Sequence, residues 1–308
     1  MRHTLSPGSG FFAVAALVAV LLVWPTAANA QLGGPPYVDP DRVLALEYAV
    51  KDLKNAVNKL LTLLTCVSRK EGEINGVSGP HLLITGCNVH IRSGSGATHD
   101  TTTNLGNLII GYNEPRGVLN GDPPDTTNRT GSHTLIIGPE HQFTASGGLL
   151  AGFRNTVTGE SASVSGGQLN TASGIQASVS GGGENTASGP RASVSGGAEN
   201  MASGGVASVS GGSANEASGG QASVSGGSSN KASSTSASVS GGLFNEASGG
   251  SASVSGGQNN KASGAHASVS GGEKNEASGS FASVSGGNSR TADEIDEWCA
   301  GTQACQKP

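Results

Sequence analysis

Residues 162–176 read Ala-Ser-Val-Ser-Gly-Gly-Gln-Leu-Asn-Thr-Ala-Ser-Gly-Ile-Gln, and the same 15-residue phrase returns with little variation between Ser161 and Thr291. Its valine occurs nine times at a step of 15, from Val164 to Val284. A fixed period over that many copies is the signature of a solenoid, in which each repeat is one small unit stacked on its neighbours. The repeat therefore predicts an all-β solenoid with one 15-residue rung per copy.

Each repeat divides into two short strands. Ala-Ser-Val-Ser alternates apolar and polar residues, which predicts a strand with Ala and Val inward and both serines outward. Gly-Gly then permits a tight turn with positive φ. The second half, Asn-x-Ala-Ser-Gly, predicts a strand with Asn and Ala inward and a second glycine turn. Ser234 replaces that second glycine once, and we expect a local irregularity there.

The asparagine of each repeat lies on the predicted inner side. Equal side chains in stacked rungs are about 4.8 Å apart, so each amide can hydrogen-bond the next in a ladder. Arg290 occupies the place after the last asparagine. The members of this predicted ladder are Asn155, Asn170, Asn185, Asn200, Asn215, Asn230, Asn245, Asn260 and Asn275.

The residue after each asparagine forms another column. From residue 216 onward its charges alternate in the order Glu216, Lys231, Glu246, Lys261 and Glu276. In a parallel stack each charge would lie between two opposite charges, which contributes about 0.2–1 kcal/mol per pair. The alternation supports stacking of the rungs independently of the valines.

A heptad pattern precedes the repeats, between residues 41 and 67. Its steps of three and four predict a helix with a coiled-coil seam, because the sequence shows no second helix to cover it. The alternative is a single amphipathic helix packed on its own domain. The a and d positions are Val43, Leu46, Val50, Leu53, Val57, Leu60, Leu64 and Val67. Val at a with Leu at d favours a dimer, whereas Leu61 and Leu63 broaden the apolar face and permit a trimer.

Residues 68–160 are predicted to be an irregular part of the same solenoid. Four phrases look like one short strand followed by glycine: His81–Gly86, Asn107–Gly111, Thr134–Gly138 and Leu149–Gly152. The excursion 114–132 contains three prolines and cannot be a continuous strand. Residues 161–291 form the regular part, and residues 292–308 are a C-terminal tail.

The first 30 residues have the pattern of a secretory signal peptide. An apolar run from Phe11 to Trp24 precedes Ala28-Asn29-Ala30, a small-x-small cleavage site. A Gly/Pro-rich linker, residues 31–40, follows. We expect an exported protein at the cell surface or outside the cell, with no membrane-spanning segment in the mature chain.

Four cysteines fit that compartment. Cys66 and Cys87 flank one segment, and Cys299 and Cys305 lie near the C-terminus. In an oxidising environment two local pairs favour the disulfides 66–87 and 299–305, although three connectivities are open from sequence.

Charge and motif content exclude several classes of function. The chain has 17 basic and 22 acidic residues and no basic block, which argues against a nucleic acid or an anionic membrane as partner. No spacing of histidines makes a zinc site or a nucleophile–base pair, so we expect no catalysis and no cofactor or metal. The histidines at 81, 90, 99, 133 and 141 are expected in surface or turn positions.

The repeat, from about Leu135 to Ser289, resembles the head repeats of trimeric autotransporter adhesins, which have the form Ser-Val-x-x-Gly-x-x-Asn/Ser-x-Ala-Ser-Gly. The resemblance implies a left-handed parallel β-roll, three copies around one axis, and coiled-coil segments. This chain departs from the family in three ways: the period is 15 where the family usually has 14, the coiled coil comes first, and no strands for a membrane-anchor barrel follow. The C-terminal residues are Gln306-Lys307-Pro308.

These features predict a non-catalytic homo-oligomer, adhesin-like or structural, that binds an extracellular or surface ligand by many weak contacts. One alternative is an ice-binding β-solenoid, because Asn155-Thr156-Val157-Thr158-Gly159 is similar to the coils of some ice-binding proteins. Such proteins usually present ranks of Thr, whereas this chain presents mostly Ser. The other alternative is an inert structural spacer.

Overall fold

The structure is a computed structural model and describes residues 39–63, 65–117, 128–301 and 304–307. The predicted signal peptide and all but the end of the predicted linker lie outside these residues. The chain divides into two compact units, Met1–Val89 and His90–Pro308.

The first unit contains helix α2 (Pro40–Leu63). Asp39 caps it, since its Oδ1 accepts a hydrogen bond from the Asp41 N–H at 3.0 Å, and Pro40 occupies the first helical position, where its missing N–H costs nothing. The heptad ends sooner than we predicted. Leu64 lies outside the described residues, and Val67 begins strand β1 instead of belonging to the helix.

The predicted seam of α2 is open to solvent. Val50, Leu53 and Leu60 are 50%, 53% and 56% exposed, although all three are apolar. α2 is the only helix among the described residues, so no second helix of that part of the chain packs on it. The coiled coil itself stays a prediction.

Two small antiparallel pairs follow the helix. Strand β1 (Val67–Lys70) pairs with β4 (His81–Ile84), and β2 (Glu73–Ile74) pairs with β3 (Val77–Ser78). Our prediction that residues 81–86 form a solenoid strand is therefore wrong, because β4 pairs antiparallel within the first unit. The Cys66–Cys87 disulfide, with an S–S distance of 2.10 Å, joins the two ends of this segment as predicted.

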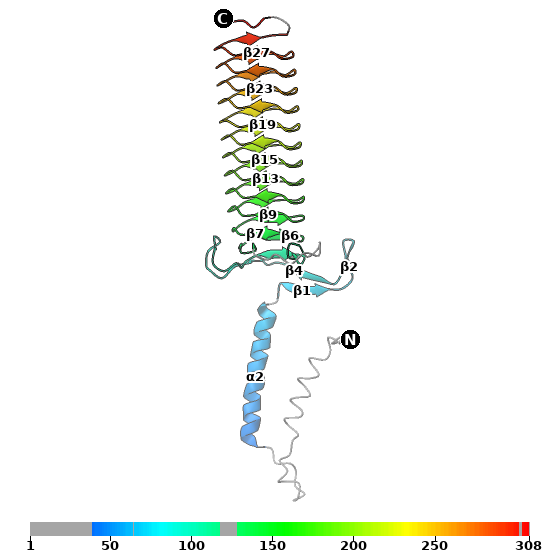
Figure 1. Cartoon of the computed structure of the whole chain (residues 1–308). Helices are drawn as coiled ribbons and strands as arrows, with labels where there is room; N and C mark the ends of the chain where they lie inside the picture. The colour runs from blue at the N-terminus through cyan, green and yellow to red at the C-terminus, as the bar shows by residue number, and fades with distance from the viewer. Residues whose placement is uncertain (1–38, 64, 118–127, 302–303, 308) are drawn as a thin grey trace, which may run out of the picture. The chain divides into compact units, whose positions relative to one another are not determined.

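The second unit is a parallel β-solenoid with rungs of about 15 residues (Figure 1). Its first sheet has 13 strands and its second has 11, and each strand pairs with its equivalents one rung away. The first sheet begins with β5 (Leu108–Ile110), β6 (Leu135–Ile137) and β8 (Leu149–Ala151). Its remaining strands are β10 (Ser163–Val164), β12 (Ser178–Val179), β14 (Ser193–Val194), β16 (Ser208–Val209), β18 (Ser223–Val224), β20 (Ser238–Val239), β22 (Ser253–Val254), β24 (Ser268–Val269), β26 (Ser283–Val284) and β28 (Trp298–Cys299).

The second sheet consists of the predicted Asn-x-Ala strands. They are β7 (Gln142–Phe143), β9 (Thr156–Val157), β11 (Thr171–Ala172), β13 (Thr186–Ala187), β15 (Met201–Ala202), β17 (Glu216–Ala217), β19 (Lys231–Ala232), β21 (Glu246–Ala247), β23 (Lys261–Ala262), β25 (Glu276–Ala277) and β27 (Thr291–Ala292). A third column of single parallel bridges, such as Gln168 to Gly183, links the rungs between the two sheets.

The core consists of stacked identical side chains. In each regular rung two alanines and the valine are buried, as the alternation predicts. Larger residues take these places at the N-terminal end, where Ile136 and Leu150 precede the valines and Phe143 and Val157 precede the alanines. Because a terminal rung is packed from one side only, bulkier apolar residues compensate for the thin alanine–valine core.

Two kinds of position require glycine for different reasons. The second glycine of the Gly-Gly pair, such as Gly227, has φ +85°, and an added Cβ would lie 2.2 Å from the Gly242 oxygen. The glycine of the second turn, such as Gly219, does not have a positive φ. Glycine is required there because the next rung lies too close for a side chain, and a Cβ on Gly219 would lie 1.9 Å from the Ser234 oxygen. The predicted irregularity at Ser234 is small. Gly219, the equivalent residue one rung earlier, donates its N–H to the Ala232 oxygen at 3.3 Å, whereas in the described rungs the Ser234 N–H makes no such bond to the next rung.

The C-terminal residues close the solenoid. The segment that we predicted as a tail carries the last strand, β28, and Trp298 forms an antiparallel pair with Gln306 through N–O bonds of 2.9 and 2.8 Å. The predicted Cys299–Cys305 disulfide holds this return, with an S–S distance of 1.97 Å. Gln306 thereby covers part of β28, the edge strand of the first sheet.

Candidate functional site

The nine predicted ladder asparagines are buried and in register. The Asn170 N–H donates to Asn155 Oδ1 at 2.8 Å, and the Asn170 Nδ2 donates to the oxygens of Gly166 at 3.1 Å and Gly182 at 3.0 Å. The other rungs repeat this arrangement through Asn275. The bonds differ from our expectation, since each amide contacts the backbone of its own and the next rung and not the neighbouring amide. A side chain that satisfies backbone groups of two rungs fixes their spacing directly.

The ladder extends beyond the asparagines of the repeat. At its C-terminal end the Arg290 N–H donates to Asn275 Oδ1 at 2.9 Å. At its N-terminal end His141 takes the place of an asparagine, and its N–H donates to Asn113 Oδ1 at 3.0 Å. Our expectation that His141 lies at the surface is wrong, because the residue is 0% exposed. The step from His141 to Asn155 is 14 residues and departs from the 15-residue period, so the repeat pattern does not reveal this role.

The surroundings of His141 keep it neutral. Burial lowers the pKa of His141 below 6.5, and the nearby positive charges of Arg116 and Arg129 act in the same direction, against the hydrogen bond to the Ile137 oxygen, which favours the proton. Arg129 Nε donates to the His141 carbonyl oxygen at 3.1 Å, which holds one of these charges beside the ring. A neutral imidazole can both accept and donate, as the amide of asparagine does.

A buried ion pair lies next to this position. Glu140 is fully buried, and its Oε2 lies 3.0 Å from Arg154 Nε. Arg116 Nη2 donates to the Arg154 oxygen at 2.8 Å and to Thr156 Oγ1 at 3.1 Å. These contacts connect the irregular first rungs to the regular ones. They satisfy backbone groups and leave no arrangement of nucleophile and base, so we assign them a structural role.

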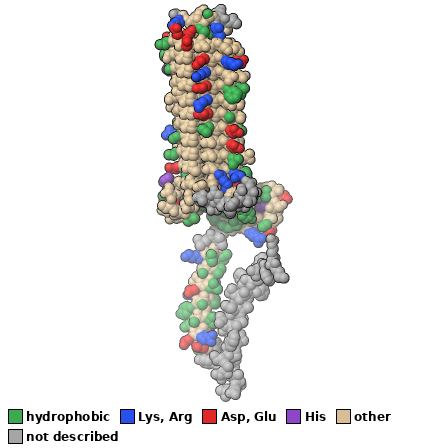
Figure 2. Space-filling model, in the orientation of Figure 1, with side chains coloured by type: hydrophobic (Ala, Val, Ile, Leu, Met, Phe, Trp, Pro, Cys, Tyr) green, Lys and Arg blue, Asp and Glu red, His purple; other side chains and the backbone are tan. Residues whose placement is uncertain are grey.

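The alternating charges form one vertical column on the second sheet (Figure 2). Lys231 Nζ lies 3.0 Å from Glu216 Oε2. Burial would raise the pKa of Glu216, but hydrogen bonds from Ser218 and Lys231 outweigh it and leave that pKa below its ordinary value. The threonines that begin this column stop at Met201, which interrupts the rank that ice binding would need.

The first sheet presents a uniform outer surface. Its outward places in the regular rungs are two serines, and we call the rows from Ser163 and Ser165 to Ser283 and Ser285 the serine face. The first row is half-buried and the second is exposed. Neighbouring serines repeat at the strand spacing of about 4.8 Å, so the face is a flat array of hydroxyl groups.

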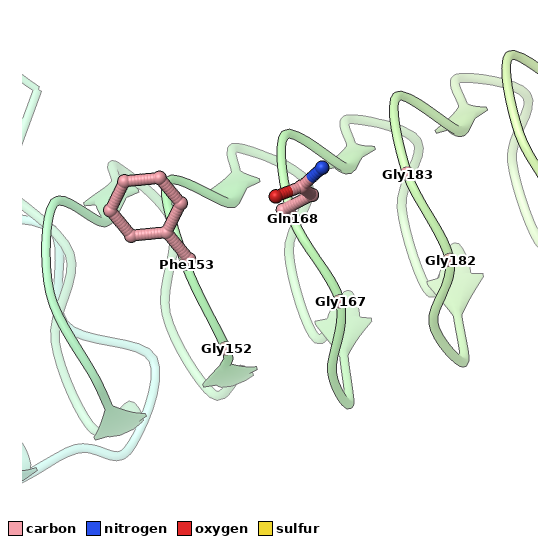
Figure 3. Close-up of a pocket in the computed structure, with 6 residues that line it drawn as sticks. All are labelled: Gly152, Phe153, Gly167, Gln168, Gly182 and Gly183. Carbon is pink, nitrogen blue, oxygen red and sulfur yellow. The ribbon is translucent and has the colours of Figure 1, made fainter.

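A shallow furrow runs along the column of single bridges (Figure 3). Its lining consists of Gly152, Phe153, Gly167, Gln168, Gly182 and Gly183. The side chains of Phe153 and Gln168 lie one rung apart, and glycine leaves the next place empty (Figure 3). Only one polar side chain lines the furrow, whereas ligand pockets have several converging polar groups. We therefore assign it no ligand.

The described residues contain no group of three or more His, Cys, Asp or Glu side chains that could hold a metal ion. His99 Nδ1 lies 3.1 Å from Ser146 Oγ and 3.2 Å from Glu160 Oε1, so both contacts are made by the same ring nitrogen. A relay would need the carboxylate and the hydroxyl on opposite ring nitrogens. The candidate functional features among the described residues are therefore outer surfaces of the solenoid, namely the serine face and the charge column.

No protein-family model matches this sequence, and no curated protein matches it either. In the part of the chain that the structure describes, no helix has the length and apolar character needed to cross a membrane.

Proposed function

We propose that this protein is an exported homo-oligomeric rod that displays a repeated surface outside the cell, in an adhesin-like or structural role without catalysis. The observation that carries the proposal is the continuous ladder from His141 to Arg290, which makes the rungs a rigid stack. Its regular rungs present the same outward serines from Ser163 to Ser285. A ligand that contacts one rung weakly can contact many rungs at once, so that affinity grows with length.

Two features support export. The cleavage pattern at residues 28–30 is that of a secreted chain. The two disulfides are of a kind that persists in oxidising compartments.

The exposed seam of α2 supports self-association. Apolar residues at Val50, Leu53, Val57 and Leu60 are 43–56% exposed on a helix that no other described helix covers. A second or third copy of α2 would bury this seam with matched heptads. We favour a trimer, in line with the resemblance to trimeric head repeats.

The oligomer is tested by the native mass of the mature chain in light scattering. We expect a trimeric mass for the wild type and a monomeric mass for Leu53→Asp with Leu60→Asp. Asn55→Asp, on the opposite side of the heptad, is the matched control and should keep the oligomer. A monomeric wild type would contradict the proposal.

A shortened solenoid distinguishes the adhesive role from the spacer role. Deleting residues 192–221 removes two whole rungs and keeps the 15-residue register. If the rod is adhesive, the shortened protein should be retained less well on surfaces coated with extracellular-matrix protein or polysaccharide. If it is a spacer, retention stays unchanged and only the reach of the rod shortens.

A further inference from the structure

The serine face changes character at its N-terminal end. In register with Ser163 lie Leu149, then Leu135, then Leu108, all pointing outward because Leu150 and Ile136 between the rows are buried. The second outward row starts with Ile110 and Ile137 before Ala151.

Several of these outward apolar residues are open to solvent. Leu108, Ile110 and Ile137 are 45%, 52% and 37% exposed. At the other end of the face Trp298 follows Ser283 in the same row and is 40% exposed. A contiguous apolar patch of this kind on a sheet marks an interaction surface more often than a solvated one.

The serine face is also free of charge throughout its regular part. Charged side chains of residues 161–291 all occupy other columns: Glu184, Arg191, Glu199, Glu216, Lys231, Glu246, Lys261, Glu273, Lys274, Glu276 and Arg290. Sequence variation between the regular rungs also lies outside the serine face, whose Ala-Ser-Val-Ser phrase is the same in all nine copies. When copies of one chain pack around a rotation axis, each residue near the axis lies close to the same residue of the other copies. A charged residue there would be repelled by its own copies, so a face that packs at the axis should carry no charge.

We propose that the serine face and its apolar ends are the surface along which copies of this chain pack side by side, with their rungs in register. Only a partner with the same rung spacing can match the serine rows over their whole length, and a second copy has that spacing. In a parallel arrangement Leu108 and Ile110 of one copy face the equivalent residues of the next, and the uncharged serines face serines. The inference rests on the proposed homo-oligomer and names the surface that it uses.

Single-cysteine variants of the full mature chain test this surface. Ser165→Cys, Ser225→Cys and Ser285→Cys place a thiol at the beginning, middle and end of the exposed serine row. Ser213→Cys is the matched control, since Ser213 is also an exposed serine of a regular rung but lies in the column of single bridges. The native cysteines are paired in disulfides, so a short bismaleimide reagent reacts at the new thiol.

We expect the three face variants to shift from the monomer band to a covalent dimer band on a denaturing gel, since one thiol per chain can join only two chains, and Ser213→Cys to remain monomeric. Cross-linking of Ser225→Cys without Ser165→Cys and Ser285→Cys would mean an antiparallel contact and would overturn the in-register arrangement. An oligomeric native mass with no cross-link on the serine face would overturn this inference and leave the oligomer standing. A monomeric native mass would overturn both.

Discussion

The Nδ1 atom of His141 accepts a hydrogen bond from the Asn155 N–H at 3.2 Å, in the place where an asparagine Oδ1 accepts in every following rung. Its Nε2 atom lies 3.0 Å from the oxygen of Ile137, four residues earlier in the chain. Asn170 Nδ2 likewise donates to the oxygen of Gly166, four residues before it. One ring nitrogen must accept and the other donate. Histidine therefore fits this place only as the neutral Nε2–H tautomer.

Stability is expected to fall as the pH drops from about 7.5 to about 5.5, a range in which histidine titrates and most carboxylates do not. Burial lowers the pKa of His141 below 6.5, so the unfolded chain takes up a proton at a higher pH than the folded chain. The stability contributed by the neutral ring is complete above about pH 6.5 and is lost progressively below it. Thermal unfolding followed by circular dichroism at several pH values measures this loss.

His141→Asn is the matched variant, because asparagine occupies the equivalent place in the regular rungs. The variant should keep the ladder and lose most of the pH dependence. Every other histidine is the same in both proteins, so the difference between the two curves belongs to residue 141. Equal slopes for the two proteins would contradict the assignment of His141 to the ladder.

Asn230→Ala is expected to lower the free energy of unfolding by about 2–4 kcal/mol, since a buried group left without its partner costs about 1–3 kcal/mol. The substitution removes the acceptor of the Asn245 N–H and the donor to the oxygens of Gly226 and Gly242. Lys231→Ala, an exposed neighbour on the same strand end, should cost less than 1 kcal/mol, as surface pairs contribute about 0.2–1 kcal/mol. Chemical denaturation of the two variants provides the comparison, and an equal loss would argue against the ladder as the main link between rungs.

The adjacent glycines of one rung should respond in opposite ways to alanine. Gly227 has φ +85°, and its added Cβ would meet Asn230 Nδ2 at 2.5 Å, so Gly227→Ala disturbs both the turn and the ladder. Gly226 has open space around the added carbon, and its φ lies outside the left-handed range. Gly226→Ala should leave the melting temperature unchanged or raise it slightly, because alanine restricts the unfolded chain by about 0.4–1 kcal/mol. A larger loss at Gly226 than at Gly227 would contradict the assigned turn geometry.

The regular rungs could be predicted from sequence because their period and their alternation agree. Val164 and Ala172 repeat at a fixed step, and alternation along a strand decides which side chains point inward. Stacking at a common step then places each Asn above the next. These inferences need no knowledge of how closely the rungs approach.

The remaining features depend on contacts that a repeat pattern does not show. Asparagine bonds to the backbone, because its amide lies beside the glycine oxygens of two rungs and not beside another amide. His141 was missed since the step there is 14 and the residue type differs. Val206 and Phe281 adopt positive φ at 61° and 59°, which the repeat pattern does not predict, and their hydrogen bonds to neighbouring rungs hold them in that uncommon conformation.

Lys231→Glu tests the charge column. The substitution places three carboxylates in register, since residue 231 lies between Glu216 and Glu246. Two attractions become two repulsions, so we expect a loss of about 0.5–2 kcal/mol at low salt. Lys231→Gln removes the attractions without adding repulsion and should lose less. Salt screens exposed charges, so the gap between Glu and Gln at this position should narrow at high ionic strength in thermal unfolding. If Lys231→Glu were as stable as Lys231→Gln at low salt, the alternating charges would have no part in holding the rungs in register.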